Sequence, residues 1–518
     1  MAEAKHKPLS FSTTMRNPVR IAWFLKCVQP YEGEILTNDI IYKIISNVIR
    51  NKLYFTVYEK KVYRLKNIFK SIDENFTDAD IQEIISNSPQ KHKEAGFDYW
   101  RPSRFDTWYK IQKEFWFIWY SMWEKIEISP LGYELISAIE QEQIDSEKIQ
   151  NIFLNSLVKY QTSNPFRKTL NDNVPLMLLL NVINKLKVID PNSCWIYRRE
   201  IPFFICRKNN DAQSLCDFLI SFRNWKLWGY SDEIVYNECL NILWYWEKDK
   251  DYIKISQVEW EAVDEYIRKM RITWVISLRW NWRALDFNTL EQEKINYILW
   301  NYQNYQTYDD WKEYYEYMWL KDDSLFSEVA IQENKLEDLR KRKLKELAWA
   351  YNTEEIFSEL TILSKNQESK HDLLKFIDKP VRLEFLTALS LVQNFPTLEV
   401  SPNYTVDDEW LPKYTAGWWI ADIVCEDWNN RELVEVTMMS WRNQVHNEII
   451  PIARHLKESK QENENSYSLF IAPVIHPDAS EMVIWYKHKD DIDIKALKIE
   501  DYIEKVKLWW NLIDIIIN

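Results

Sequence analysis

The feature that most limits what this chain can fold into is its shortage of glycine. The 518 residues include 5 Gly and 27 Trp, whereas glycine makes up about 7% of an ordinary protein. Turns and helix ends commonly need a positive φ, which glycine adopts freely and a bulky side chain adopts only with strain. Gly and Trp together amount to 32 residues. Their combined share of the chain is close to the share that glycine alone has in an ordinary protein.

Several tryptophans stand where the chain should turn. Trp123 lies in a turn between two short apolar segments, and Trp428 lies between two predicted strands. Others are next to glycine or in further turn-like positions: Trp228, Trp280, Trp282, Trp410, Trp418 and Trp419. The pattern predicts that most tryptophans occupy glycine positions, as they would if the host reads UGA as glycine and this translation reads it as tryptophan. The alternative is a truly Trp-rich protein, and Trp108, on a predicted helix, is a candidate for a genuine tryptophan.

Length and composition predict a multidomain cytoplasmic protein. A chain of this length exceeds one ordinary core, so we expect two or three domains. No run approaches the roughly 18 apolar residues of a membrane span, and the first ten residues lack the apolar segment of a secretion signal. The six cysteines form no C-x-x-C pair, so we expect reduced, mostly buried thiols and neither a zinc site nor a disulfide framework.

The chain is expected to contain three regions. Residues 1–290 mix helical periodicity with short hairpins, residues 291–375 are polar and helix-like, and residues 376–518 alternate helix and strand signals as an α/β domain does. No proline occurs between Phe287 and Asp378, which favours long helices linking two domains rather than a flexible linker.

Two segments of the first region follow the plan of a winged-helix DNA-binding module. The first should form a helix to Glu114, a hairpin over 117–128, and a helix that Ser129-Pro130 opens as N-cap and first residue. The second should form a helix followed by the hairpin strands Val275–Leu278 and Arg283–Phe287. Two unrelated helix–hairpin units that pack on a core would give the same pattern.

Charge is distributed unevenly. The net charge of −13 argues weakly against nucleic acid, but residues 1–70 carry 13 Lys or Arg against 5 Asp or Glu, and a second basic run spans Arg340–Lys345. Each run could be a solvated face, yet DNA responds to the local field, so an acidic protein can still have a basic recognition face.

A pair of carboxylates marks the third region. Asp422 opens the predicted strand 420–425, and Glu435 lies in the strand 432–437, which follows a turn over 426–430. Because side chains alternate along a strand, Glu435 and Thr437 share one face, and Glu435 can stand beside Asp422 across an antiparallel pair. Converging carboxylates are costly in a core but suit Mg²⁺, which prefers hard oxygen ligands. The spacing alone also fits a solvated hairpin edge.

Two helices should supply further polar groups. After the second strand, Gln444, Glu448 and His455 fall on one face of a predicted helix, and upstream Glu384 lies on the first turn of another. His446 is also nearby, but we do not expect it to be catalytic.

As a set, these motifs resemble the catalytic domain of AlwI-type type IIS restriction endonucleases and the related nicking endonucleases. The resemblance extends to Thr13–Pro18 and to the winged-helix-like segment, and so covers most of the chain. The shared motifs are Leu383-Glu384, Pro402-Asn403-Tyr404, Asp407-Asp408-Glu409 before Leu411-Pro412, Ala421-Asp422-Ile423, Val434-Glu435-Val436-Thr437, Gln444 and Glu448 before Pro451, and Arg454-His455.

The resemblance implies an α+β multidomain protein: a winged-helix-like N-terminal DNA-recognition region, a helical linker and a C-terminal α/β nuclease domain of PD-(D/E)xK type. It implies that Asp422 and Glu435 bind Mg²⁺, with help from Glu384 and a carbonyl near Val436. Gln444 and Glu448 would position water, a second metal or the helix. Thr437 stands where many relatives carry lysine, and Ala416-Gly417-Trp418-Trp419 replaces a lead rich in Pro and Gly.

These observations together predict a Mg²⁺-dependent hydrolase of double-stranded DNA that cuts a short distance outside an asymmetric site. Such an enzyme works beside a methyltransferase of the same restriction–modification system, needs no membrane, and would form a transient homodimer to cut both strands. One alternative is a site-specific nicking enzyme, and the other is a DNA-binding protein with a decayed nuclease domain.

Overall fold

A computed structural model of the chain describes most of its length as two compact units. The units are Met1–Lys66 with Phe76–Val329, and Asn67–Asn75 with Ala330–Asn518. The residues described are 6–12, 17–70, 74–88, 96–98, 101–141, 144–167, 169–191, 193–225, 231–245, 253–279, 284–302, 306–308, 310–326, 333–417, 419–439 and 444–517. Of the sequence features above, Thr13–Arg16 and the tryptophans 228, 280, 282 and 418 lie outside them.

The division near residue 330 falls inside the predicted helical linker. The helices α14 (Gln292–Asn301) and α15 (Trp311–Trp319) belong to the first unit, and α16 (Glu333–Ala350) and α17 (Thr353–Ser364) belong to the second. Each carries side chains that are fully buried, such as Ile295, Tyr314 and Leu360. These helices are therefore core elements of the two units, which the polar composition of the segment did not reveal.

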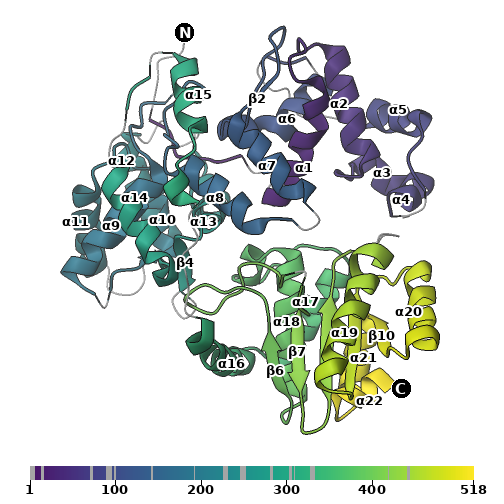
Figure 1. Ribbon diagram of the computed structural model, residues 1–518. Helices are drawn as coiled ribbons and strands as arrows, with labels where there is room; N and C mark the ends of the chain where they lie inside the picture. The colour runs from purple at the N-terminus through teal and green to yellow at the C-terminus, as the bar shows by residue number, and fades with distance from the viewer. Residues whose placement is uncertain are drawn as a thin grey trace. The chain divides into compact units, whose positions relative to one another are not determined.

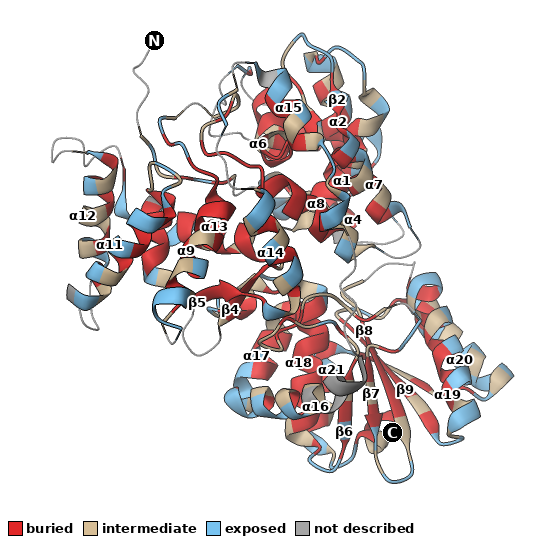
Figure 2. Ribbon diagram, turned by 60° about the vertical axis from the view of Figure 1, so that its left-hand side comes forward, coloured by how far each residue is buried: buried red, intermediate tan, exposed pale blue. Residues whose placement is uncertain are grey.

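The first unit is mainly helical (Figure 1). Besides α14 and α15, its described α-helices are α1 (Pro18–Val28), α2 (Asn38–Arg50), α3 (Val57–Lys61), α4 (Tyr63–Lys70, which spans the boundary at Lys66), α5 (Asp78–Asn87), α6 (Arg101–Glu114), α7 (Pro130–Glu140), α8 (Ser146–Leu157), α9 (Pro175–Ile189), α10 (Ile201–Ile205), α11 (Ala212–Trp225), α12 (Asp232–Leu243) and α13 (Ala262–Arg271). Asn17 caps α1 through a hydrogen bond from Arg20 N, and α8 and α9 are buried along most of their length (Figure 2).

The elements predicted for the first winged-helix-like segment are present. Helix α6 leads to β1 (Ile118–Trp119), which pairs antiparallel with β2 (Glu127–Ile128), and α7 follows. Ser129 caps α7 as predicted, because its hydroxyl accepts from Gly132 N at 3.0 Å. Gly132 is required here, since a Cβ would lie 2.3 Å from the carbonyl oxygen of Phe117.

The second predicted hairpin is also present. The strands β4 (Ile276–Arg279) and β5 (Ala284–Phe287) pair antiparallel after α13, and β3 (Ile196–Tyr197) adds a third strand in the order β3-β5-β4. The third strand comes from eighty residues upstream, so this hairpin is part of a small sheet.

The second unit is built on a five-stranded sheet (Figure 1). Its order is β10-β9-β8-β7-β6; the pairs β6/β7 and β7/β8 are antiparallel, and β8/β9 and β9/β10 are parallel. The strands are β6 (Glu399–Pro402), β7 (Ile423–Glu426), β8 (Arg431–Val436), β9 (Ser466–Ala472) and β10 (Ile494–Lys498). The predicted strands 420–425 and 432–437 correspond to β7 and β8 with a shift of one to three residues.

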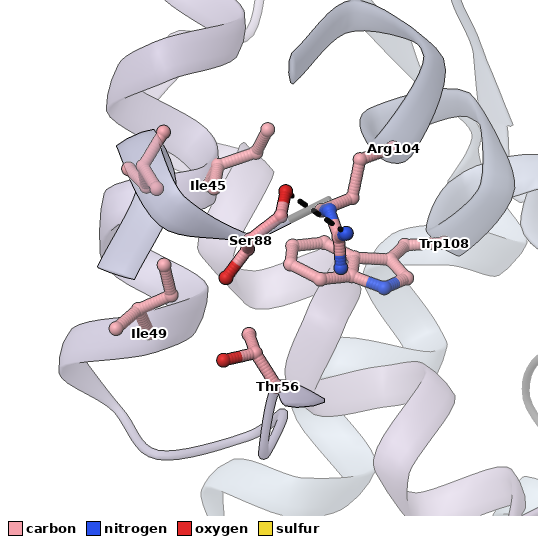
Figure 3. Close-up of a pocket in the computed structure, with 7 residues that line it drawn as sticks. Ile45, Ile49, Thr56, Ser88, Arg104 and Trp108 are labelled. Carbon is pink, nitrogen blue, oxygen red and sulfur yellow. Dashed lines mark hydrogen bonds between the residues drawn. The ribbon is translucent and has the colours of Figure 1, made fainter. Parts of the chain in front are cut away.

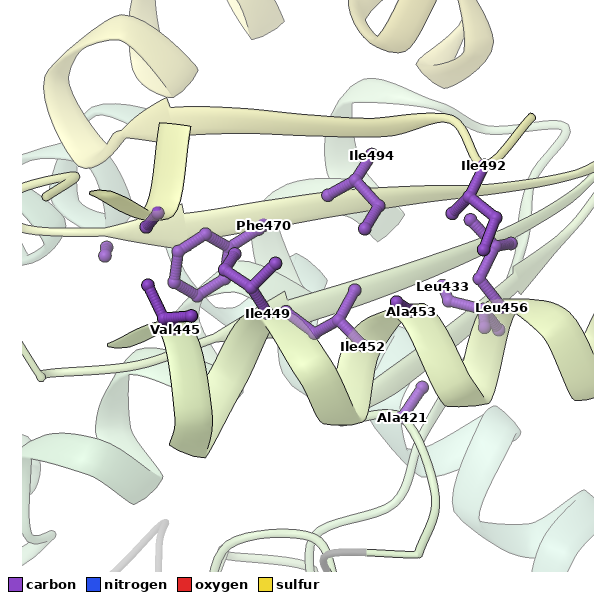
Figure 4. Packing of buried hydrophobic residues seen from close by; sticks show 12 residues of the cluster. Ala421, Leu433, Val445, Ile449, Ile452, Ala453, Leu456, Phe470, Ile492 and Ile494 are labelled. Carbon is purple, nitrogen blue, oxygen red and sulfur yellow. The ribbon is translucent and has the colours of Figure 1, made fainter. Parts of the chain in front are cut away.

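Helices cover both faces of this sheet. Helices α18 (Lys379–Asn394), α21 (Ile499–Leu508) and α22 (Leu512–Ile517) pack on one face, and α19 (Ile450–Glu462) and α20 (Pro477–Asp490) pack on the other. Figure 4 shows Ile449, Ile452 and Leu456 of the second layer against Leu433 and Phe470 of the sheet. This apolar contact fixes α19 beside β8, the strand that carries Glu435.

The basic run Arg340–Lys345 lies on α16, and part of it binds the protein itself. Arg340 donates to the carbonyl of Pro402 at 3.3 Å, and Lys341 forms an ion pair with Glu399, both on the edge strand β6. These two cations help to hold α16 over the edge of the sheet, which favours the structural interpretation for that part of the run.

Positive φ angles gather at tryptophan. Among the described residues, eight that are not glycine have a positive φ, and five of them are Trp116, Trp123, Trp244, Trp274 and Trp410. Trp419 and Trp428 are not in this group. At Trp428 the Asp427 carboxylate accepts from the backbone N–H groups of Asn429 and Asn430, which closes the turn without a positive φ.

Two further predictions can be compared with the structure. All six cysteines are buried, and none of them is joined in a disulfide in the structure. Within the described residues, no helix is both long enough and apolar enough to span a membrane.

Candidate active site

The β7/β8 hairpin brings Asp422 and Glu435 together. The register pairs Ile423 with Val434, so Asp422 and Glu435 are opposite each other one step further along. The Asp422 carboxylate accepts from Val436 N at 2.7 Å, and the Glu435 carboxylate accepts from Asp422 N at 3.2 Å. Each carboxylate is therefore fixed by the backbone of the opposite strand. The alternation of side chains along β8 predicted this placement.

Helix α18 adds Glu384, whose carboxyl group lies near that of Asp422. Its side chain is 2% exposed, and it accepts a hydrogen bond from Ala416 N at 3.1 Å. Because α18 begins at Lys379, Glu384 lies in its second turn rather than in its first. Glu384 thus connects α18 to the loop that leads into β7.

Glu448 reaches the site through a wide helical turn. Residues Val445–Ile449 form a π-helix before α19, and the Glu448 carboxylate hydrogen-bonds with Thr437 at the end of β8. The Thr437 hydroxyl also accepts from Met439 N at 3.0 Å. Thr437 is thus a neutral group that holds the adjacent loop and lies beside the Glu448 carboxylate.

Gln444 does not join the carboxylates. Its amide nitrogen donates to the carbonyls of Met439 and Val474, both at 2.7 Å, and its amide oxygen accepts from His476 N at 2.8 Å. These bonds engage both ends of the amide and tie together the loops that follow β8 and β9. The predicted common face of Gln444 and Glu448 assumed an α-helix, and the π-turn changes the angle between them.

His455 is a site residue that the sequence analysis placed on the correct face but gave no role. It is 7% exposed, and its Nδ1 lies 2.9 Å from Oε1 of Glu435, itself 7% exposed. The ring donates this hydrogen bond when Glu435 is ionised. The signal was available, since His455 is seven residues after Glu448, two turns along the helix. His446, by contrast, is exposed.

Burial and neighbouring carboxylates raise the pKa of three carboxyl groups at the site. Burial raises the pKa of Asp422 well above its usual range, and the charges of Glu384 and Glu435 raise it further. Burial, Glu435 and Glu448 do the same to the pKa of Glu384. Burial raises the pKa of Glu448 to about 7, against the hydrogen bond from Thr437. The site therefore concentrates negative charge that a cation would offset.

The donor set fits Mg²⁺. The oxygens come from carboxylates that backbone N–H groups hold in place, and Mg²⁺ is commonly bound by one or two protein carboxylates together with waters and substrate phosphate. In the described part of the chain, no three acidic, His or Cys side chains already surround one metal position. Asp422 and Glu435, each held by the backbone of the opposite strand, are the residues that would hold such an ion.

A family model decides what this site belongs to. The model of the AlwI restriction endonuclease matches residues 114–352 and 328–504 of the chain. The chain belongs to the AlwI restriction endonuclease family. This AlwI-family protein is therefore an enzyme, a type II site-specific deoxyribonuclease, as the motifs around Asp422 and Glu435 predicted.

Comparisons with other proteins add little to the family match. No curated protein is significantly similar to this AlwI-family chain. Among solved structures, the small subunit of the heterodimeric restriction endonuclease R.BspD6I is 20% identical over 30% of this chain and 76% of its own, with a TM-score of 0.26. Restriction endonuclease FokI is 10% identical over 98% of this chain and 95% of its own, with a TM-score of 0.25. The structure of FokI bound to DNA has a TM-score of 0.24. Scores this low carry no argument about the site.

Proposed function

We propose that this enzyme hydrolyses DNA with Mg²⁺ in a PD-(D/E)xK-type domain, its second unit, and reads a short asymmetric site with its first unit. Cleavage then falls a few base pairs outside the site, because reading and cutting belong to different units. The observation that carries the proposal is the cluster of four carboxylates, from Asp422, Glu435, Glu384 and Glu448, at one end of the β7/β8 hairpin.

The metal would be held by Asp422 and Glu435, with Glu384 and the Val436 carbonyl as further oxygens. A bound Mg²⁺ orients and acidifies a water and stabilises charge on the phosphate. The residues of this chain set the geometry: Val436 N orients Asp422, and Asp422 N and His455 orient Glu435. Glu448 and Thr437 lie next to Glu435 and are placed to position the attacking water.

Two features support the first unit as the DNA reader. Its N-terminal segment is basic, and it contains both helix–hairpin segments of the winged-helix plan. The partners we propose are double-stranded DNA, a methyltransferase of the same specificity, and a second copy of the chain during double-strand cleavage. The intact carboxylate group argues against a decayed nuclease.

Substitution of the metal-binding carboxylates tests the proposal. Asp422→Asn and Glu435→Gln should abolish plasmid cleavage in Mg²⁺ while specific DNA binding, measured in Ca²⁺, is unchanged, since each removes a charged ligand and keeps the shape. Glu426→Gln, at the exposed far end of the same hairpin, is the control and should cut normally. Substantial cleavage by either site variant would contradict the assignment. The ratio of nicked to linear plasmid from the native enzyme separates nicking from double-strand cutting.

A further inference from the structure

The first inference concerns how Asp422 is held, and it rests on the proposed function. Strand β6 ends at Pro402, which pairs with Ile423. The next residue, Asn403, continues the ladder, because its backbone N–H donates to the Asp422 carbonyl at 2.9 Å. Its side-chain amide donates to the Ala421 carbonyl at 2.7 Å. Asn403 thus binds the two carbonyls on either side of the Asp422 N–H.

The hydrogen bonds of Asn403 bear on both proposed metal ligands, Asp422 and Glu435. The Ala421–Asp422 peptide carries the N–H that binds Glu435 Oε2, and the Asn403 amide holds the carbonyl of this same peptide. We propose that Asn403 is a positioning residue: its amide fixes the plane of the Ala421–Asp422 peptide and so aligns Asp422 and Glu435 for the metal. Residues that orient metal ligands commonly contribute about 10- to 100-fold to metal affinity or activity.

Isosteric substitution separates this role from packing. Asn403→Asp keeps the shape of the side chain but places an oxygen against the Ala421 carbonyl, and Asn403→Ala removes the group. Both should lower the single-turnover cleavage rate by about 10- to 100-fold and raise the Ca²⁺ concentration for half-saturation in calorimetry, with specific DNA affinity unchanged. Asn430→Asp is the control, because Asn430 donates to Asp427 in the turn at the opposite end of the hairpin.

The outcomes are distinct. Normal cleavage and normal Ca²⁺ binding by Asn403→Asp would overturn the inference, and so would a lower melting temperature with an unchanged rate per folded molecule. If Asp422→Asn still cuts DNA, the proposed function fails; if Asp422→Asn is inactive while both Asn403 variants behave as the native enzyme, only this inference fails.

A second, independent inference comes from the backbone at tryptophan. Trp116 and Trp244 end helices α6 and α12 in the same way. Trp116 N donates to the Lys113 carbonyl and Phe117 N to that of Gln112; Trp244 N and Tyr245 N donate to the carbonyls of Asn241 and Leu240. This is the Schellman arrangement, in which the residue with positive φ is usually glycine. The φ angles are 59° at both tryptophans.

Trp123 and Trp410 occupy turn positions that favour glycine. In the turn closed by Glu124 N and the Ser121 carbonyl, Trp123 is the third residue with φ of 70°, the position of glycine in a type II turn. Trp410 follows the turn that begins at Asp407, with φ of 65°, where a three-residue hairpin loop usually has glycine.

We infer that Trp116, Trp123, Trp244, Trp274 and Trp410 are glycine in the protein that the host makes, because the host reads UGA as glycine. Positive φ strains any side chain with a Cβ at these positions, and the indole of Trp123 is 69% exposed, so its burial offsets little of that strain. Trp108 differs from these five: it lies inside α6, is 1% exposed, and its ring centroid is 4.8 Å from that of Tyr54 in a tilted arrangement.

Comparing Trp→Gly with Trp→Ala separates the effect of backbone strain on the melting temperature from the effect of losing the indole, because both variants lack the indole. At position 123, Trp123→Gly should melt about 2–4 °C above Trp123→Ala, because only glycine relieves the strain at positive φ. Trp300 is 82% exposed on α14. There Trp300→Ala should melt above Trp300→Gly, because glycine is the poorer helix former. Trp108→Gly should melt far below the parent chain, since the buried indole packs against Arg104 and forms a wall of the pocket that Ile45 also lines (Figure 3).

The host's own protein gives the decisive observation. Peptide mass spectrometry should find glycine at 116, 123, 244, 274 and 410, with UGA in the gene at each of these codons, and tryptophan encoded by UGG at 108. Tryptophan at 123 in the host protein, UGG codons at the five positions, or a Trp123→Gly variant that melts below Trp123→Ala would each overturn the inference.

Discussion

His455 shows how one side chain outside the proposed metal-ligand set can control the geometry of that set. Glu435 is bound at one oxygen by the Asp422 N–H and at the other by the His455 ring. The two contacts leave little freedom for the carboxylate to rotate. A metal bound at Glu435 therefore depends on a histidine that need not touch the metal itself.

Removal of this histidine should weaken the metal site. His455→Ala should lower cleavage by about 10- to 100-fold and shift the Mg²⁺ dependence to higher concentration. His455→Asn should recover part of the loss, because its amide offers an N–H near the position of Nδ1. Cleavage rates across a Mg²⁺ series check this, and equal rates for the alanine variant and the native enzyme would show that the hydrogen bond has no catalytic consequence. His446→Ala, at an exposed histidine, is the control.

The residues of the site were predictable where a regular period governs them. Alternation along a strand placed Glu435 and Thr437 on the face of Asp422, and in the structure Glu435 contacts Asp422. The period of an α-helix put Gln444 with Glu448, but one π-turn intervenes and Gln444 binds loop carbonyls instead. A π-turn follows from packing between distant elements, so local periodicity could not indicate it.

At the scale of elements, β8 carries a carboxyl group that the chemistry does not use. Glu432 is fully buried on the face opposite Glu435, and in the described structure neither of its oxygens has a hydrogen-bond partner. Burial, then the charges of Asp427 and Glu426, raise its pKa from the usual 4.5 to about 8. The folded unit therefore favours the neutral acid.

This buried acid should make stability fall as pH rises. Its contribution is fully present below pH 4.5, is lost as pH rises through about 8, and is on the order of 5 kcal/mol at most. Glu432→Gln should thus melt above the native chain at pH 9 and close to it at pH 4.5. Melting curves at both pH values test this, with exposed Glu481→Gln as the control. A difference that does not grow with pH would contradict the assignment.

Elements were predictable from local signals, and their partners were not. The Ser129-Pro130 start, the hairpins and the alternation of strand and helix in the last region all appear in the structure. The strand β3, which joins the hairpin β4/β5 from far upstream, was missed because only two residues form it. The predicted linker is divided between the two units for a related reason: its polar helices give no indication of which core their few apolar residues enter.

At the scale of the whole molecule, the boundary near residue 330 decides which fragments can fold. The segment after Phe287 is tied into the first unit. Asn155 of α8 and Lys159, just after that helix, both donate to the carbonyl of Leu320, and Gln161 N donates to the Tyr314 hydroxyl at 3.0 Å. A fragment that ends at Phe287 would leave these buried polar groups without their partners, at a cost of about 1–3 kcal/mol each.

Truncation at two points should therefore give different proteins. A fragment that ends at Val329 should bind the recognition site, with an affinity that falls steeply as salt rises because basic residues displace counterions from phosphate. A fragment that ends at Phe287 should melt lower or aggregate and lose this selectivity. The complementary fragment from Ala330 should bind DNA weakly and without sequence preference. Gel-shift titrations at two salt concentrations measure all three, and site selection by the fragment from Ala330 would mean that the second unit reads the sequence.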